Sequence, residues 1–151
     1  MLVRLALESD VDAIVEMGRA NVNETLPGEP FDAEIARETA LAGMRTANIT
    51  FFVVEVERKV IGFLQAEFYD FDYRSGFFTL QKVLYVSPEN RGTRAAVRLM
   101  REFIAWSKRL GAAKAKAGND NGFQSERTAR FFQHFGFRPT GYALELDLNE
   151  V

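Results

Sequence analysis

Three consecutive runs rich in β-branched and aromatic residues occupy the middle of the chain, at Ile49–Glu57, Val60–Tyr69 and Phe77–Val86. Arg58-Lys59 and the polar segment Asp70–Gly76 separate them. Runs of this composition that are joined by short turns are typical of antiparallel strands in hairpins. The pattern therefore predicts a three-stranded antiparallel meander at the centre of the fold.

Helical patterns flank this meander on both sides. Ser9–Asp12 carries N-cap residues for a first helix, and Asp32 is suited to cap a second one after the Pro- and Gly-containing loop Asn23–Phe31. An amphipathic pattern from about Thr93 to Leu110 predicts a long helix after the meander. Gly111 is placed to end that helix.

The two ends of the chain complete the predicted order of elements. We expect Met1–Leu7 to form a short strand, Ala112–Ala117 a buried strand, and Ser125–Phe135 a helix with its Phe side chains inward. Phe137–Leu148 is expected to form one or two closing strands. The resulting order β-α-α-β-β-β-α-β-α-β predicts an α+β fold, with a mixed, mostly antiparallel sheet flanked by helices.

Composition narrows the class of protein. A chain of 151 residues fits one domain, here residues 1–151. Without Cys there is no disulfide, thiolate metal site or cysteine nucleophile, and a single His cannot form a multi-His centre, so no metal is expected. No run of about 20 apolar residues is present, which predicts a cytoplasmic protein that makes no use of a membrane.

The charge distribution is strongly polarised. Residues 91–116 contain eight basic residues and a single acidic residue, Glu102, although the whole chain has a net charge of −2. A sequence pI near 5.5 argues against a dedicated nucleic-acid binder, because neutralising a nucleic-acid backbone needs a broad basic surface. A short basic block in an acidic chain indicates a small polyanionic ligand instead.

That basic block begins at an abrupt change from strand to helix, in the segment Leu84–Ala96. The first amides of a helix lack intrahelical partners and lie at the positive end of its dipole, so arginines beside them can complete a phosphate site. An ordinary strand–loop–helix junction with solvated arginines is the alternative. The segment contains neither the Gly-Lys-Ser/Thr of a P-loop nor the Gly-x-Gly-x-x-Gly of a Rossmann turn.

The segment resembles the acetyl-CoA loop of the GCN5-related N-acetyltransferase (GNAT) family. Val86-Ser87-Pro88 is similar to the family's Val-x-Pro strand end, and the loop Arg-Gly-Thr-Arg-Ala-Ala from Arg91 to Ala96 is similar to its Gln/Arg-x-x-Gly-x-Gly/Ala motif. Arg94 replaces the central Gly, as in a variant found in phage-type and bacterial members. Arg130–Phe137 resembles the family's Phe-Tyr-x-x-x-Gly-Phe motif, and the predicted order of elements also matches.

The resemblance implies acetyl-CoA as co-substrate. Amides of the loop would hold its pyrophosphate, the third meander strand would offer backbone groups to its pantetheine arm, and the Val86 amide would stabilise the oxyanion. Asn119 would contact the pantetheine, or belong only to a turn. The residues expected to bind acetyl-CoA are Leu84, Val86, Arg91, Gly92, Thr93, Arg94, Ala95, Ala96 and Asn119. As a weaker expectation, Arg98, Arg101 or Lys116 would reach the 3′-phosphate.

The implied reaction is direct attack of an amine on the thioester, and here the sequence departs from the family. The usual Tyr general acid falls on Phe132, and the frequent strand Glu falls on Leu80. Glu67 and Tyr69, at the end of the second meander strand, are the candidate catalytic substitutes, with a solvated strand end as the alternative interpretation.

The expected acceptor is a small-molecule or peptide primary amine, and a homodimer is one expected state because relatives commonly form dimers. Four acidic residues could line the acceptor cleft and favour a cationic amine: Glu24, Glu29, Asp70 and Asp72. Two other functions stay open. One is an acyl-CoA-binding or interaction protein of this fold without transferase activity. The other is a nucleic-acid or phage-associated protein that uses Arg94, Arg98 and Arg101 as a phosphate-binding stripe.

Overall fold

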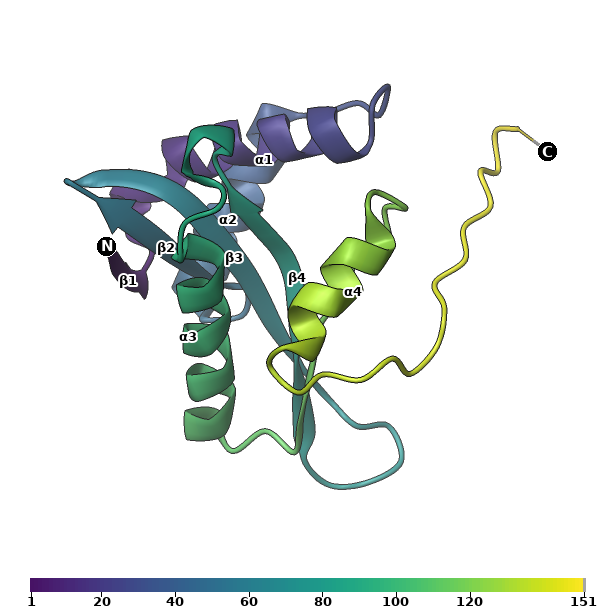
Figure 1. Ribbon diagram of the computed structural model, residues 1–151. Coiled ribbons are helices and arrows are strands. Elements are labelled where there is room, and N and C mark those ends of the chain that lie inside the picture. Colours follow the sequence, from purple (N-terminus) through teal and green to yellow (C-terminus); the bar gives the residue numbers. More distant parts are fainter. Residues whose placement is uncertain (151) are drawn as a thin grey trace.

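The computed structural model describes residues 1–150, in which helices cover both faces of one five-stranded sheet (Figure 1). The strands are β1 (Leu2–Leu5), β2 (Thr50–Val56), β3 (Lys59–Asp70), β4 (Phe77–Val86) and β5 (Lys114–Lys116). The helices are α1 (Val11–Thr25), α2 (Ala33–Thr46), α3 (Ala95–Leu110) and α4 (Ser125–Gln133), with 3-10 turns at Glu8–Asp10 and Pro88–Asn90. No helix within residues 1–150 combines the length and hydropathy that crossing a membrane requires.

The sheet has the order β1-β2-β3-β4-β5 and confirms the predicted α+β class. Neighbouring strands from β1 to β4 are antiparallel, so the predicted meander is correct, whereas β5 runs parallel to β4. The parallel pair is short, because only Phe78, Thr79 and Leu80 of β4 lie opposite β5. Among residues 1–150, no strand therefore pairs with the outer edge of β4 beyond Leu80.

Two hydrophobic cores lie on opposite faces of this sheet. On one face, Leu99, Met100 and Phe103 of α3 pack against Phe52 and Leu64. A buried hydrogen bond of 2.7 Å between the hydroxyls of Thr79 and Ser107 fastens α3 to β4 on the same face. On the other face, α1 and α2 pack against β2, β3 and β4, so the sheet is a rigid support between two layers of helices.

Local chemistry explains where the central helices begin and end. The Asp32 carboxylate accepts hydrogen bonds from the amides of Glu34 and Ile35 at 3.0 and 3.1 Å, which confirms the predicted cap of α2. Gly111 ends α3 with a φ of 84°, a left-handed conformation that favours glycine. Asp10 occupies the N-cap position of α1, but its carboxylate bonds instead to Arg4 and the Leu7 amide.

A β-bulge interrupts the pairing of β3 with β4. Gln65 pairs with Val83, but the next residue, Ala66, pairs with Gln81, so Lys82 is an extra residue in β4. A bulge of this kind bends its strand and increases the local twist. It lies two residues beyond the last contact with β5, at the point where β4 turns away from that strand.

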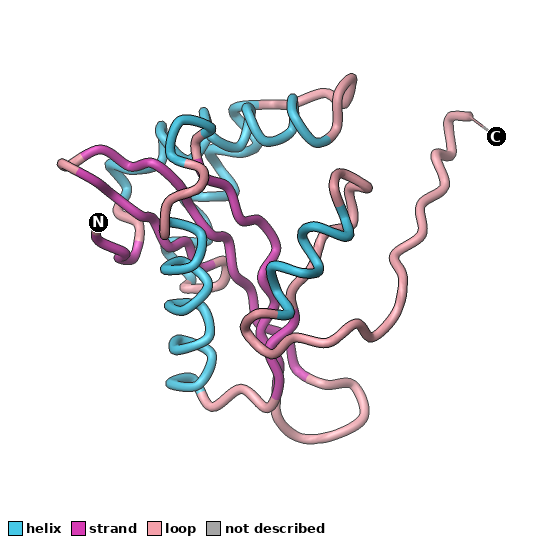
Figure 2. The backbone as a smooth tube through the Cα atoms, in the orientation of Figure 1, coloured by secondary structure: helices cyan, strands magenta, loops and turns pink. Residues whose placement is uncertain are grey.

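The prediction of closing strands at Phe137–Leu148 is wrong for this structure. The segment contains no strand within the described residues and extends away from the sheet as an arm (Figures 1 and 2). Gly136, with a φ of 94°, redirects the chain after α4, and Pro139 lacks the amide that a central strand would need. Alternating apolar residues form a strand only where they pair with another backbone edge, and within the described residues this segment pairs with none.

Gly62 provides a direct test of how closely β3 approaches the open part of β4. A Cβ at this position would lie 2.7 Å from the Tyr85 carbonyl oxygen and 3.2 Å from methyl groups of Val54 and Val86. Gly62→Ala should therefore lower the free energy of unfolding by about 1–3 kcal/mol, because the backbone of β4 has to move away from the added Cβ. Gly141→Ala is the matched control, since nothing lies within 4 Å of its Cβ position. Equal urea midpoints for Gly62→Ala and the wild-type chain would contradict this packing.

Candidate functional site

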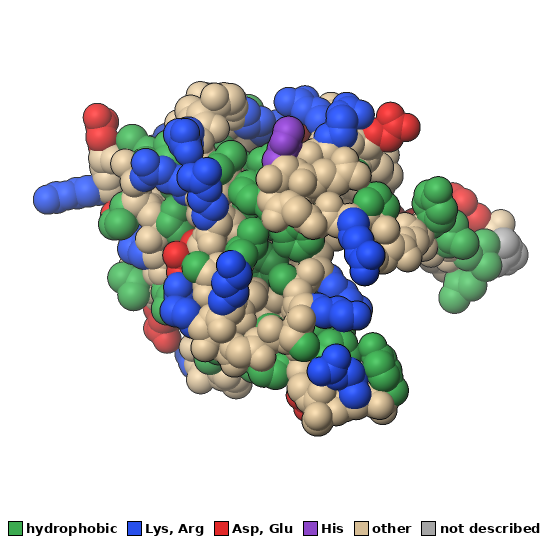
Figure 3. Space-filling view, turned by 60° about the horizontal axis from the view of Figure 1, so that its bottom comes forward, with side chains coloured by type: hydrophobic (Ala, Val, Ile, Leu, Met, Phe, Trp, Pro, Cys, Tyr) green, Lys and Arg blue, Asp and Glu red, His purple; other side chains and the backbone are tan. Residues whose placement is uncertain are grey.

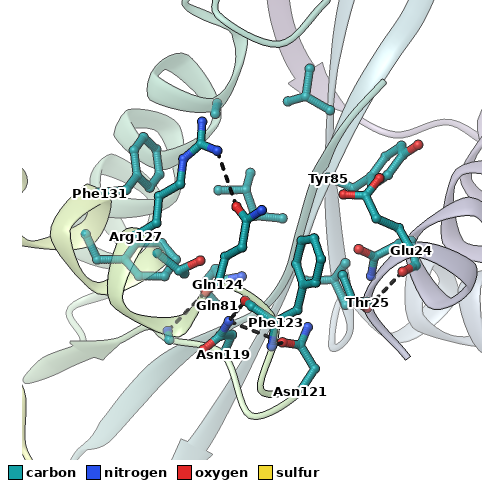
Figure 4. Close-up of a pocket in the computed structure, with 18 of the residues that line it drawn as sticks. Glu24, Thr25, Gln81, Tyr85, Asn119, Asn121, Phe123, Gln124, Arg127 and Phe131 are labelled. Atoms are coloured by element: carbon teal, nitrogen blue, oxygen red, sulfur yellow. Dashed lines mark hydrogen bonds between the residues drawn. The ribbon is translucent and has the colours of Figure 1, made fainter. Parts of the chain in front are cut away.

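A cleft of about 340 Å³ lies beside the open edge of β4 (Figure 4). Residues 81–86 of β4 form one side, and Gly118–Phe123 together with α4 form the side opposite. The end of α1 contributes Glu24 and Thr25, and the start of α3 contributes Ala96. Segments from both faces of the sheet therefore meet at this one opening.

The backbone of β4 directs polar groups into the cleft. The Ser87 amide donates to the Ile61 carbonyl at 2.8 Å, so Ser87 and Ile61 form a hydrogen-bonded antiparallel pair. Such pairs alternate with pairs whose N–H and C=O groups point outward. Val86 opposite Gly62 and Leu84 opposite Leu64 belong to the outward type. Their amides therefore point away from β3, towards the open side that β5 leaves uncovered.

The loop before α3 supplies a second group of amides. Gly92 has a φ of 82°, and a Cβ there would meet nothing within 4 Å, so the loop is open to solvent at this point. The Thr93 hydroxyl donates to the Asn90 carbonyl at 2.6 Å and accepts from the Ala95 amide at 3.3 Å. The side chain thus fixes the loop but engages only the first helical amide. Ala96, the next helical residue, lines the cleft.

Arg91 joins the loop to α1 instead of extending freely into solvent. Its guanidinium makes two hydrogen bonds to the Glu24 carboxylate, at 2.8 and 3.0 Å, and its Nε donates to the Val86 carbonyl at 2.9 Å. It also lies 5.4 Å from the ring centroid of Tyr85, whose pKa is raised by burial. Because Arg91 occupies the carbonyl of Val86, the group that Val86 leaves towards the cleft is its amide.

The other predicted basic residues lie elsewhere. Arg94 is exposed at the N-cap of α3. Arg98 donates to the Met1 carbonyl at 2.6 Å, and with Arg101 it lines a shallow groove beside β1. Lys116 lies 4.1 Å from the ring centroid of Phe78. None of these four residues lines the cleft. The positions of Arg98, Arg101 and Lys116 therefore give no support to the expectation that one of them reaches the 3′-phosphate, and the expected contact of Arg94 with the pyrophosphate stays a prediction.

The wall opposite β4 is held by side-chain amides. Gln81, 4% exposed, accepts a hydrogen bond of 3.3 Å from the Gly118 amide and so bridges the gap where β4 and β5 separate. Asn119 lines the cleft, and its Nδ2 donates to the Phe123 carbonyl at 2.8 Å and to the Asn121 side chain at 3.2 Å. Asn119 is therefore a residue of the cleft wall whose amide group closes a turn, and its contact with pantetheine stays a prediction.

The buried carboxylate of Glu67 contacts two exposed residues, Tyr69 and the bulge residue Lys82. Glu67 is 4% exposed, accepts a hydrogen bond from the Tyr69 hydroxyl, and pairs with Lys82 Nζ at 3.3 Å. The hydrogen bond to this carboxylate raises the pKa of Tyr69, so the phenol stays protonated at neutral pH. Lys82 lines the cleft, whereas Glu67 and Tyr69 adjoin it through Lys82.

The structure shows the surroundings of the two residues that depart from the family pattern, Phe132 and Leu80. Phe132 is 4% exposed and packs against Phe131 and Phe137, with ring centroids 5.5 and 6.0 Å apart. Leu80 lies directly opposite Glu67 in the register of β3 and β4. A carboxylate is therefore present at this level of the sheet, on the neighbouring strand.

Sequence reasoning missed or misplaced several of the residues around the cleft. Gln81, Lys82 and Arg127 were not singled out, and no local pattern in the sequence places the bulge at Lys82. The four acidic residues do not gather, because the α1–α2 loop with Glu29 and the β3–β4 loop with Asp72 lie at opposite ends of the molecule (Figure 1). Of the four, Glu24 lines the cleft.

Comparisons with known proteins agree with this geometry. Residues 47–139 match the model of the acetyltransferase (GNAT) domain family. No curated protein matches the chain. Within residues 1–150, no group of three His, Asp or Glu side chains could hold a metal ion.

Among solved structures, a predicted acetyltransferase from Clostridium acetobutylicum with acetyl-CoA has a TM-score of 0.81 and 18% identity, covering 99% of this chain and 97% of that one. A possible acetyltransferase from Clostridium difficile 630 has a TM-score of 0.81 and 16% identity, covering 97% and 95%. An acetyltransferase from Trypanosoma brucei has a TM-score of 0.76 and 19% identity, covering 97% and 99%. At these identities the likeness concerns the fold.

Thr93 allows the preorganisation of the α3 loop to be tested. Thr93→Val removes the hydroxyl but keeps the shape, so it should lower the free energy of unfolding by about 1 kcal/mol. Thr93→Ser keeps both hydrogen bonds and is the control. Chemical denaturation checks the difference, and a Thr93→Val variant as stable as Thr93→Ser would show that the hydroxyl does not hold the loop.

Proposed function

The chain belongs to the acetyltransferase (GNAT) domain family, and on that premise we propose that it transfers the acetyl group of acetyl-CoA to a primary amine. The observation that carries the proposal is the separation of β4 from β5 after Leu80. It leaves the amides of Leu84 and Val86 directed into a cleft that ends at the amide-rich loop before α3.

The residues present fit such a co-substrate. The loop Gly92–Ala96 offers backbone donors at the positive end of a helix, which suits a pyrophosphate. Arg91 borders the same end of the cleft and would add positive charge once its pairing with Glu24 is loosened or shared. Along β4, the amides of Leu84 and Val86 would bind the amide-containing pantetheine arm as a neighbouring strand would.

When bound, acetyl-CoA supplies an acyl group that is activated as a thioester. The Val86 amide would donate to the acyl oxygen and stabilise the negative charge that develops there as the amine attacks. Arg91 already donates a hydrogen bond to the Val86 carbonyl, which would fix the orientation of the Val86 backbone. The Val86 amide would then point in one direction, and the carbonyl beside it would not be a free acceptor. Preorganised donors of this kind cost no reorganisation during the reaction.

Glu67 is our proposed proton acceptor for the amine. Its carboxylate is buried and lies at the level of the bulge, and Lys82 connects it to the cleft. Tyr69 would orient the carboxylate through its hydrogen bond. In the proposed reaction the ammonium first loses one proton to Glu67, directly or through water. The neutral amine then forms the C–N bond, the nitrogen loses its second proton to solvent, the C–S bond breaks, and the thiolate takes one proton from solvent. No general acid is required, because a thiol with a pKa near about 8.5 can leave as the thiolate.

A second candidate function is acyl-CoA binding without transfer. Phe132 favours it, because its buried ring has no hydroxyl where the family resemblance places a Tyr. Release of free thiol from acetyl-CoA across a panel of amines separates the two functions. Transfer requires thiol release that depends on an amine, whereas binding without any release would support the second candidate.

Acetyl-CoA should raise the melting temperature of the protein, because it binds the native state. At 100 times its dissociation constant a ligand stabilises by about 2.7 kcal/mol. Gly92→Asp should abolish the shift by placing a carboxylate in the anion site. Gly28→Asp is the matched control, since Gly28 has a similar φ of 92° and equally open surroundings. The absence of a shift in the wild-type protein at millimolar acetyl-CoA would overturn the proposed binding.

Removing the carboxylate of Glu67 should affect the reaction more than the binding of acetyl-CoA. We expect Glu67→Gln to lower kcat/KM for the best amine of the panel by about 10²–10⁴. The shift of the melting temperature with acetyl-CoA should remain. Glu38→Gln, at an exposed position on α2, serves as the control. A Glu67→Gln variant with wild-type thiol release would exclude Glu67 as the proton acceptor.

A further inference from the structure

Lys82 is the one lysine of the chain that lines the cleft. The sequence contains four other lysines, and these lie outside the cleft: Lys59, Lys108, Lys114 and Lys116. Met1, whose amino group is the remaining primary amine, borders the shallow groove beside β1. Figure 3 shows Lys and Arg side chains spread over the surface of the molecule, so exposure alone does not distinguish Lys82. Its position in the cleft does.

The β-bulge sets the direction of the Lys82 side chain. Neighbouring side chains of a regular strand point to opposite faces of the sheet, and an extra residue breaks this alternation. Val83 packs on the core beneath α1 and α2, and Lys82 reaches Glu67, which shares a face of β3 with Phe63 of that same core. Regular alternation would place Lys82 on the other face, with Leu84. The bulge therefore brings the amine to the carboxylate.

The amine of Lys82 is accessible and is also paired with a carboxylate. Its Nζ lies 3.3 Å from Oε1 of Glu67. The side chain of Lys82 is 54% exposed, whereas that of Glu67 is 6% exposed. An ammonium has to lose a proton before its nitrogen can attack a thioester, and a carboxylate within hydrogen-bond range can accept that proton. Lys82 thus has the surroundings that the proposed reaction requires of an acceptor amine.

The acyl group of the co-substrate would approach Lys82 along β4. With the pyrophosphate at the loop before α3, the acyl end of acetyl-CoA would lie on the side of the cleft towards the bulge. Lys82 precedes Val86 by four residues, about 13 Å along an extended strand. The flexible four-carbon side chain of Lys82 and the acyl group held at the Val86 amide would extend towards each other across this span.

We propose that Lys82 Nζ accepts the acetyl group when no other amine occupies the cleft, so that the protein acetylates itself at this position. The proposal rests on the proposed acetyl transfer. The Lys82 ammonium loses one proton to Glu67, and the neutral amine attacks the carbonyl carbon and forms the C–N bond. The nitrogen loses its second proton to solvent, the C–S bond breaks, and the thiolate takes one proton from solvent. The neutral N-acetyl-lysine can no longer form the ion pair with Glu67.

Mass spectrometry of the full chain, incubated with acetyl-CoA and no added amine, tests the proposal. We expect one acetyl group per chain, on the peptide that contains Lys82. Its rate should exceed that at Lys59 by about tenfold or more. Lys59 is exposed at the start of β3 and reports non-enzymatic acetylation. The rate constant should not depend on protein concentration, because the amine and the cleft belong to one chain. Equal acetylation of both lysines would overturn the proposal.

Lys82→Arg removes the nucleophile but keeps a positive charge beside Glu67. Without an amine, the wild-type chain should release one thiol per chain from acetyl-CoA, and Lys82→Arg should release none. Lys59→Arg is the matched control and should behave as the wild type. Glu67→Gln should slow acetylation of Lys82 by about tenfold or more, because the proton acceptor is lost. Acetylation of Lys82 at the wild-type rate in Glu67→Gln would contradict the proposed proton transfer, which a purely ion-pairing Lys82 would not need.

The panel of amines separates this proposal from the proposed function. Thiol release that depends on an amine, with Lys82 unmodified in the absence of amines, would overturn self-acetylation and leave the proposed function intact. A melting temperature raised by acetyl-CoA, with neither amine-dependent release nor acetylated Lys82, would overturn acetyl transfer itself and this proposal with it.

Discussion

The candidate site depends on the way in which two neighbouring strands separate. β4 and β5 share only three paired residues, and beyond Leu80 the backbone of β4 continues without a partner on that side. Backbone N–H and C=O groups left without a strand must bond to water, to side chains or to a ligand. Gln81 bridges the gap at its base and Arg91 occupies the Val86 carbonyl at its far end. The cleft between them is consequently bordered by directed amide donors.

Much of this arrangement follows from the sequence, because its signals are local. Alternation and short turns identified the meander, and the Pro88 and Gly92 segment located the transition from β4 to α3. Asp32 and Gly111 act as the caps that their residue types predict. Amphipathic spacing identified α3 and the inward Phe residues of α4. These features depend on neighbours within a few positions, which one sequence contains.

The parts that sequence reasoning did not provide depend on distant partners. The Arg91–Glu24 pair joins residues 67 positions apart, so no local pattern announces it. The bulge at Lys82 depends on how two strands fit together. The wrong prediction of closing strands at Phe137–Leu148 shows the same limit, because alternation is a local signal whereas pairing needs a distant strand, and this segment pairs with none within the described residues.

The central claim is that the amides of β4 and of the α3 loop bind the co-substrate. Amide hydrogen exchange followed by NMR, with and without acetyl-CoA, tests it at single residues. We expect slower exchange at Leu84, Val86 and the loop Gly92–Ala96, with little change at exposed amides of α2. Unchanged exchange at Leu84, Val86 and Gly92–Ala96 in a protein saturated with acetyl-CoA would show that the ligand binds without these amides.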